Sequence, residues 1–252
     1  MEREANEKKS IVRAVDRSLD ILLCFLQHKE LNLTEIAHLV SLHKSTVFRL
    51  VQTLENKGFL IKTMDTEKYR LGYKILELSA NIVGKNDPAI LFLPEMQSLR
   101  DRIGETISLY IKDGYERLRI QSVESQLPIR RVAPVGARMP LSVGASSKVL
   151  VAYSDSGEKQ QILQYLKENE QIDLEQFEKQ LSKVKNQGYA TSFEEREQGT
   201  SAVSVPIFSH SGKILAALTV SGPINRLTYR RIKEIIPILG ESQKRLNRLI
   251  HL

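Results

Sequence analysis

Apolar residues recur at helical spacing in the first sixty positions and predict three consecutive helices. The first spans about 12–28. The second opens at Asn32, with Glu35 three residues later in a capping-box pattern, and directs Ile36, Ala37, Leu39 and Val40 inward. The third covers about 44–57, and Gly58 follows as its stop signal. The apolar positions of the first helix are Val15, Leu19, Leu22, Leu23 and Leu26.

Two short strand-like runs come next, at 59–63 and 68–72, separated by a polar turn. Three helices followed by such a hairpin predict a winged helix-turn-helix. Amphipathic helices are expected at about 72–85 and 89–103, and Asp87-Pro88 separates them. The predicted domains are a winged helix-turn-helix at 10–73, a linker helix at 74–88 and a second domain at 89–252.

The second domain alternates between the two periodicities and predicts an α+β fold. Turn residues at 112–115 and 209–212 are typical of hairpins and favour a largely antiparallel sheet. The expected helices cover about 146–153, 157–167, 174–186 and 228–250. The expected strands cover 106–114, 116–125, 129–136, 189–193, 199–210 and 213–223.

The third helix has two faces. At about 100° per residue, with Val47 at 0°, the positions of Leu50, Val51 and Leu54 form one apolar stripe. The opposite face is polar, as a helix that reads base edges in the major groove requires. The backbone N–H groups at its start suit a phosphate, and basic residues of the hairpin, Lys62 among them, suit phosphate contacts. The predicted DNA-binding residues are His43, Lys44, Ser45, Thr46, Arg49, Gln52, Lys68 and Arg70.

The net charge indicates less about the function than the two faces of the third helix do. The chain has 252 residues and a net charge of +7. Residues 1–86 hold 14 Lys and Arg against 11 Asp and Glu, and the remainder holds 23 against 19, so the excess is not gathered in one half. Charge alone therefore leaves DNA, RNA and an ordinary solvated surface open.

Several classes of protein lack support in the sequence. The single cysteine, Cys24, forms no internal disulfide and is expected to be a buried core thiol in a reducing compartment. The apolar stretch 214–225 is too short to span a membrane, and the charged start has no secretory signal, so we expect a cytoplasmic protein. The five histidines are scattered, which gives no expectation of a metal or other cofactor, and no nucleophile motif supports an enzyme. An enzyme or a non-DNA interaction module stays the alternative.

Residues 33–79, LTEIAHLVSLHKSTVFRLVQTLENKGFLIKTMDTEKYRLGYKILELS, resemble the amino-terminal domain of the IclR family of bacterial transcriptional regulators. Residues 138–153, RMPLSVGASSKVLVAY, and the run at 188–223 that ends in Ser-Gly-Pro resemble its second domain. The resemblance covers about 11–245 and implies a GAF-like domain that binds a small organic effector, with a carboxylate expected, and carries oligomer contacts. It further implies operator DNA as a partner, a homodimer with a dimer of dimers as the alternative assembly, and a regulator expected to be a repressor.

The resemblance also implies an effector pocket at the loop-to-helix junction 144–148. There, small residues and free N–H groups suit an anion, and Ser and Thr hydroxyls would orient a carboxylate. Ser142 and Ser147 depart from the family pattern, and the structural alternative is that Ser146 and Ser147 only cap a helix. The implied effector-binding residues are Met139, Leu141, Gly144, Ala145, Ser146, Ser147, Lys148, Glu195, Ser204, Thr219 and Ser221, with Val143 as a further apolar wall.

Overall fold

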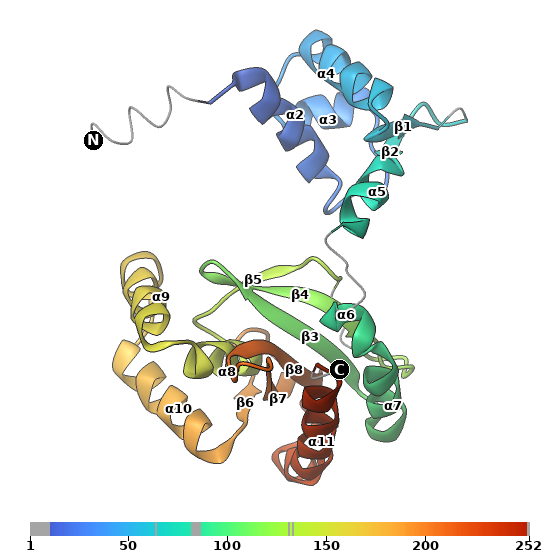
Figure 1. Cartoon of the computed structure of the whole chain (residues 1–252). Coiled ribbons are helices and arrows are strands. Elements are labelled where there is room, and N and C mark those ends of the chain that lie inside the picture. Colours follow the sequence, from blue (N-terminus) through green and yellow to red (C-terminus); the bar gives the residue numbers. More distant parts are fainter. Residues whose placement is uncertain (1–10, 64, 82–86, 131, 133, 251–252) are drawn as a thin grey trace. The chain divides into compact units, whose positions relative to one another are not determined.

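The computed structural model describes residues 11–63, 65–81, 87–130, 132 and 134–250. The chain divides into two compact units, Met1–Gly84 and Lys85–Leu252 (Figure 1). Within the described residues, no helix is both long and apolar enough to cross a membrane.

The amino-terminal unit is a winged helix-turn-helix, as predicted. Helices α2 (Arg13–Cys24), α3 (Leu33–Leu39) and α4 (Lys44–Asn56) precede the hairpin of β1 (Leu60–Lys62) and β2 (Tyr69–Leu71). The core of the unit collects Ile21, Phe25, Leu31, Ile36, Val47, Val51, Leu54, Leu60 and Tyr69.

Local signals in the sequence position these helices. The Asn32 side chain accepts hydrogen bonds from the N–H groups of Thr34 and Glu35, both at 2.9 Å, and the Glu35 carboxylate accepts from the Asn32 N–H at 2.7 Å. This is the predicted capping box, and it satisfies N–H groups that the first turn of α3 leaves unpaired. Gly58 follows α4 with a φ of 77°, in the left-handed region that favours glycine.

The apolar stripe predicted for the first helix is largely exposed. Ile21 and Phe25 enter the core, whereas Val15, Leu19, Leu23 and Leu26 are between 53% and 73% exposed. Leu39 of α3 is also exposed, against the prediction, because α3 is only seven residues long and turns Ile36 alone fully inward. The apolar face of α2 therefore has no partner within the described part of this unit.

Cys24 is half-buried rather than a full core residue. Its thiol donates to the Asp20 carbonyl oxygen at 3.3 Å. Burial raises the pKa of the Cys24 thiol, and the nearby Asp20 charge raises it further. The thiol is therefore protonated and weakly nucleophilic at neutral pH.

The two helices predicted at 72–85 and 89–103 are shorter or divided in the structure. Helix α5 covers Lys74–Ala80, and residues 82–85 of the predicted helix lie outside the described residues. The single helix expected at 89–103 is wrong, because α6 (Pro88–Leu91) and α7 (Leu93–Ile103) are separate and meet at Phe92. The break has a chemical reason, since Pro94 in the first turn of α7 has no N–H with which to continue a longer helix.

The carboxy-terminal unit has a six-stranded sheet in the order β5-β4-β3-β8-β7-β6. All neighbouring strands are antiparallel, which confirms the predicted α+β fold. The strands are β3 (Thr106–Asp113), β4 (Glu116–Val123), β5 (Arg138–Pro140), β6 (Ala190–Phe193), β7 (Thr200–Phe208) and β8 (Ile214–Pro223). The helices besides α6 and α7 are α8 (Ala145–Tyr153), α9 (Ser156–Asn169), α10 (Leu174–Gln187) and α11 (Tyr229–Leu249).

Helices cover both faces of this sheet, but the side chains on the two faces differ in size and polarity. Alternate residues of β3, β7 and β8, such as Leu109, Val205 and Leu218, pack with α7 and α11 in one large apolar core. The other face packs with α8 to α10 in a second core and is poorer in large side chains along β8 (Figure 1). Because successive strand residues point to opposite faces, Thr219 and Ser221 belong to this second face.

The strand expected at 129–136 is wrong. The described residues of this stretch form no strand, and β5 begins only at Arg138. Pro134 cannot donate to a sheet, and Gly136 has a φ of 87°, so the backbone turns here instead of pairing. The apolar residues that suggested a strand, Ile129, Val132 and Val135, are exposed.

Glu95 links α7 to α11 and makes the stability of this unit depend on pH. Its carboxylate accepts from Arg245 at 2.7 Å and from the Ser242 hydroxyl at 2.5 Å. Burial raises the pKa of Glu95, but the hydrogen bonds from Arg245 and Ser242 and the charge of Arg245 outweigh it, so the pKa lies below the ordinary value. A lowered folded-state pKa gives stabilisation that is present above the unfolded pKa and lost as pH falls through the folded pKa.

We therefore expect Glu95→Gln to lower the unfolding temperature at pH 7, with a difference from wild type that shrinks as pH falls below about 4. Thermal unfolding between pH 3 and pH 7 measures this. Glu241→Gln is the matched control, because the Glu241 carboxylate is exposed and makes a long surface contact of 3.4 Å with Arg102. If the unfolding temperature of Glu95→Gln lies below that of wild type by the same amount at every pH, the ion pair of Glu95 does not make stability depend on pH.

Candidate nucleic-acid interface and small-molecule pocket

Helix α4 buries one stripe and exposes the opposite face. Val47 and Val51 are fully buried and Leu54 nearly so. On the other side His43, Lys44, Ser45, Arg49 and Gln52 are exposed, and Thr46 is half-buried. The structure thus brings six of the predicted DNA-binding residues onto one side and the first turn of one helix.

Phe48 lies on the same exposed side and was missed in the sequence. It is 44% exposed, which is unusual for a phenylalanine in so small a unit. Phe48 lies about 100° around the helix axis from the buried Val47, and this angle is the signal in the sequence that its side chain points away from the core. An exposed aromatic next to polar residues can contact a thymine methyl group in a major groove.

The hairpin contributes basic residues beside this helix. Lys68 and Arg70 are half-buried. Lys62 pairs with Glu67 at 2.9 Å, and this hydrogen bond raises the pKa of Lys62. Lys62 therefore stays protonated, but the Glu67 carboxylate offsets its charge within the hairpin, so Lys68 and Arg70 are the better candidates for phosphate contacts.

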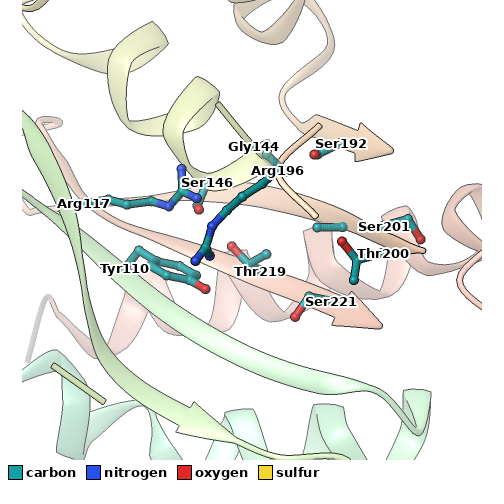
Figure 2. A pocket seen from close by; sticks show the side chains of 12 residues that line it. Tyr110, Arg117, Gly144, Ser146, Ser192, Arg196, Thr200, Ser201, Thr219 and Ser221 are labelled. Carbon is teal, nitrogen blue, oxygen red and sulfur yellow. The ribbon is translucent and has the colours of Figure 1, made fainter. Parts of the chain in front are cut away.

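A cavity of about 440 Å³, including its open mouth, lies in the carboxy-terminal unit. It lies between the start of α8, the loop that joins β6 to β7, and the second face of the sheet (Figure 2). The cavity exists because small residues on β7 and β8 leave that face unfilled. Its lining consists of Tyr110, Arg117, Gly144, Ala145, Ser146, Ser192, Arg196, Thr200, Ser201, Ala202, Thr219 and Ser221.

Ser221 has an unused hydroxyl in this cavity. It is 5% exposed, and its Oγ has no hydrogen-bond partner within the described part of the chain. Thr219, two residues earlier on β8, pairs with Ser204 at 2.9 Å. A buried hydroxyl without a partner carries a desolvation cost that a bound polar group would relieve.

Two arginines give the cavity positive charge, and a tyrosine lies with them in the lining. Arg117 is 3% exposed and donates to the Pro140 carbonyl oxygen at 3.1 Å, and also to the Val143 carbonyl and the Ser147 hydroxyl. Arg196 donates to the Met139 sulfur at 2.7 Å. Figure 2 shows its guanidinium reaching toward Tyr110 and Thr219. Sequence reasoning missed all three residues of this group, Tyr110, Arg117 and Arg196.

The residues implied by the family resemblance separate into two groups. Gly144, Ala145, Ser146, Thr219 and Ser221 line the cavity. Met139, Leu141, Ser147, Lys148, Glu195 and Ser204 lie next to it but are not part of the lining.

In the second group, Lys148 and Glu195 hold the start of α8 in place. The Lys148 amine contacts the Glu195 carboxylate at 2.5 Å and donates to the Thr191 carbonyl oxygen at 3.1 Å. Glu195 also accepts from the Gly144 N–H at 3.2 Å. The protein's own carboxylate therefore occupies part of the anion site that was expected at this helix start.

No group of three or more metal-binding side chains occurs among the residues that the structure describes. Arginine guanidinium groups and Ser and Thr hydroxyls line the cavity, so its chemistry is that of hydrogen bonds and positive charge. It suits a small polar molecule with an acidic group.

A winged helix-turn-helix joined to a domain with such a cavity defines the class of ligand-responsive DNA-binding regulators. Two family models match in order along the chain, the IclR helix-turn-helix domain over residues 14–62 and the carboxy-terminal domain of the bacterial transcriptional regulator IclR over residues 81–248. The protein belongs to the IclR family of transcriptional regulators, which are not enzymes.

Individual relatives agree with this assignment. The transcriptional regulator XynR of Escherichia coli is 34% identical over 223 residues, which cover 86% of this chain and 88% of XynR. The structure of IclR from Thermotoga maritima is 27% identical, has a TM-score of 0.79 and covers 96% of this chain and all of that one. An IclR homologue from Microbacterium hydrocarbonoxydans, complexed with 4-hydroxybenzoate, shares the fold with a TM-score of 0.81 and 21% identity, over 94% of this chain and 99% of that one.

Proposed function

We propose that α4 reads an operator in the DNA major groove and that Arg49 and Gln52 contact base edges. The exposed polar face of α4, directly opposite its buried stripe, is the observation that carries this proposal. His43, Lys44, Ser45 and Thr46 at the start of the helix approach the backbone, and Lys68 and Arg70 of the hairpin contact phosphates. Phosphate contacts position the helix, and the base contacts give specificity.

The proposed assembly is a homodimer, with a dimer of dimers as its extension, on a pseudo-palindromic operator. One small helix reads only a few base pairs, so two copies are needed for useful specificity. The exposed apolar face of α2 consists of Val15, Leu19 and Leu23, and the exposed Val12 and Leu26 lie just outside the two ends of the helix. This face supports self-association, since such faces are rare on isolated domains.

The proposed effector is a small carboxylate that binds in the cavity and relieves repression in the cytoplasm, where the DNA lies. Arg196 and Tyr110 supply charge and a hydroxyl, and Ser221 offers an unused hydrogen-bonding group. The 4-hydroxybenzoate complex of the Microbacterium homologue gives a carboxylate precedent in the same fold. Effector binding would alter the spacing of paired α4 helices, a coupling of about 1–3 kcal/mol.

Ser221→Ala separates a ligand-binding hydroxyl from a structural one. Without effector, the substitution removes a buried group that has no partner, so we expect the free energy of unfolding to stay unchanged or rise by about 1 kcal/mol. Operator affinity should remain near that of wild type, while release by effector should weaken. Urea unfolding and operator release by a panel of small carboxylates, including 4-hydroxybenzoate, measure both effects.

Ser204→Ala is the control, because Ser204 makes hydrogen bonds to Leu218 and Thr219 and lies outside the cavity lining. It should destabilise the unit. A Ser221→Ala protein that responds to an effector as wild type does would remove this residue from the proposed site.

A further inference from the structure

A groove in the amino-terminal unit lies between α4 and α2, beside the exposed polar face of α4. It measures about 1070 Å³, including its open side. Three of its side chains are arginines, and no acidic residue belongs to the lining. The lining consists of Arg13, Ala14, Arg17, Thr46, Arg49, Leu50 and Thr53.

The three arginines are not engaged in ion pairs within the described part of this unit. The pairs found there are Lys62–Glu67 and Lys74–Glu77. Arg13 and Arg49 are exposed and Arg17 is half-buried. Asp16 and Asp20 are also on α2, but neither lines the groove. The positive charge of the groove is therefore available to an external anion.

Helix geometry separates this basic side of α2 from its apolar side. Arg13 and Arg17 are four residues apart, so they lie one above the other on one side of the helix. At about 100° per residue, each is at least 160° from Val15 on the exposed apolar face. One helix can therefore use two surfaces at once, an apolar one and a basic one.

We propose that Arg13 and Arg17 bind phosphates of the DNA next to the stretch that α4 reads, so that α2 forms a second phosphate-binding surface in addition to the hairpin. The inference rests on the proposed function, because it needs α4 in the major groove. Arg49 joins the two surfaces, since it lies both on the exposed face of α4 and in the lining of the groove. DNA fits this groove because an extended row of phosphates can meet several guanidinium groups along the helix.

The test measures DNA affinity against salt for the full-length chain and for Arg13→Ala/Arg17→Ala. Fluorescence anisotropy is recorded with the duplex upstream of the chain's own gene and with a random duplex of equal length, between 50 and 200 mM salt. Each lost phosphate contact lowers the slope of log K against log salt by about 0.9, so the double variant should lose about 1.8 for each bound protomer and about 3.6 for a bound homodimer. The deficit in affinity of the double variant should then shrink on the order of tenfold for one bound protomer, and on the order of a hundredfold for a bound homodimer, across this range.

Two further variants make the result specific. Arg13→Lys/Arg17→Lys keeps the charge and should recover most of the slope. Lys29→Ala removes one exposed charge of the same unit outside the groove and should leave the slope within experimental error of wild type. Circular dichroism shows that each variant is folded.

The outcomes are distinct. An equal loss on both duplexes with a reduced slope is the expected result. If wild type binds both duplexes and the double Ala variant keeps its affinity and slope, α2 does not contact phosphate and the inference is wrong. A loss confined to the upstream duplex would also contradict it, since that result indicates base reading. If wild type binds neither duplex at 50 mM salt, the proposed function itself fails.

Discussion

Arg49→Ala is expected to weaken binding to the operator by about 1–3 kcal/mol, up to roughly a hundredfold, and to relax the preference at one base pair. Arg49 is exposed on α4, on the side opposite the buried Val47 and Val51. A guanidinium in this position can donate two hydrogen bonds to the edge of a guanine, and alanine replaces neither. Affinity for the operator and for single-base variants of it measures both effects.

Arg49→Lys is the matched control for this prediction. Lysine keeps the charge but lacks the planar pair of donors, so the affinity for unrelated DNA should survive while the base preference still falls. If Arg49→Ala instead reduces affinity equally on every sequence, Arg49 is a phosphate contact and base reading belongs to other residues of α4.

Arg117→Ala is expected to give the largest loss of stability, about 3 kcal/mol in the free energy of unfolding of the carboxy-terminal unit. The guanidinium is buried and holds the Pro140 and Val143 carbonyls and the Ser147 hydroxyl. Removing it takes the donor from the Val143 carbonyl, whereas the Pro140 carbonyl keeps the Ser147 hydroxyl as a donor at 2.9 Å. A buried group left unpaired costs about 1–3 kcal/mol. Urea unfolding followed by circular dichroism measures the change.

Arg138→Ala is the control, because Arg138 lies on a strand of the same sheet but is half-exposed and pairs with Asp113 and Glu116 at the surface. Its loss should cost less than about 1 kcal/mol. Arg117→Ala should also abolish the response to effector, because the turn that leads into α8 loses its support. Equal costs for the two substitutions would mean that the buried hydrogen bonds of Arg117 contribute no more than a surface pair.

The amino-terminal unit was predictable because its signals are local. The capping box at Asn32, the stripe of α4 and the stop at Gly58 each depend on neighbours within a few residues. The exposure of the apolar face of α2 was not predictable, because periodicity shows that a face exists and does not show whether the same unit covers it.

The cavity depended on contacts distant in sequence. Arg117 belongs to a strand with alternating character, where an arginine is typical of a solvated face, and only the turn before α8 buries it. Conversely, Lys148 and Glu195 were expected to face a ligand, whereas they pair with each other. The two are 47 residues apart in sequence, and sequence spacing carries no information about that contact.

The stretch 129–136 shows the same limit at the level of secondary structure. Its apolar residues resemble a strand, but Pro134 and the left-handed Gly136 prevent pairing. Strand β5 begins only at Arg138, two residues after the end of the predicted strand. Proline in a short apolar run was the signal against a strand.

The assignment of α4 as the DNA-reading helix is tested most directly by an electrophoretic shift of the DNA upstream of the chain's own gene. The shift is measured at 50 and 200 mM salt, with wild type and Arg49→Ala side by side. We expect wild type to form a discrete complex that resists excess random DNA and weakens at higher salt, and Arg49→Ala to lose the resistance to competitor. Absence of any shift by wild type at 50 mM salt would contradict the assignment of α4 as the DNA-reading helix.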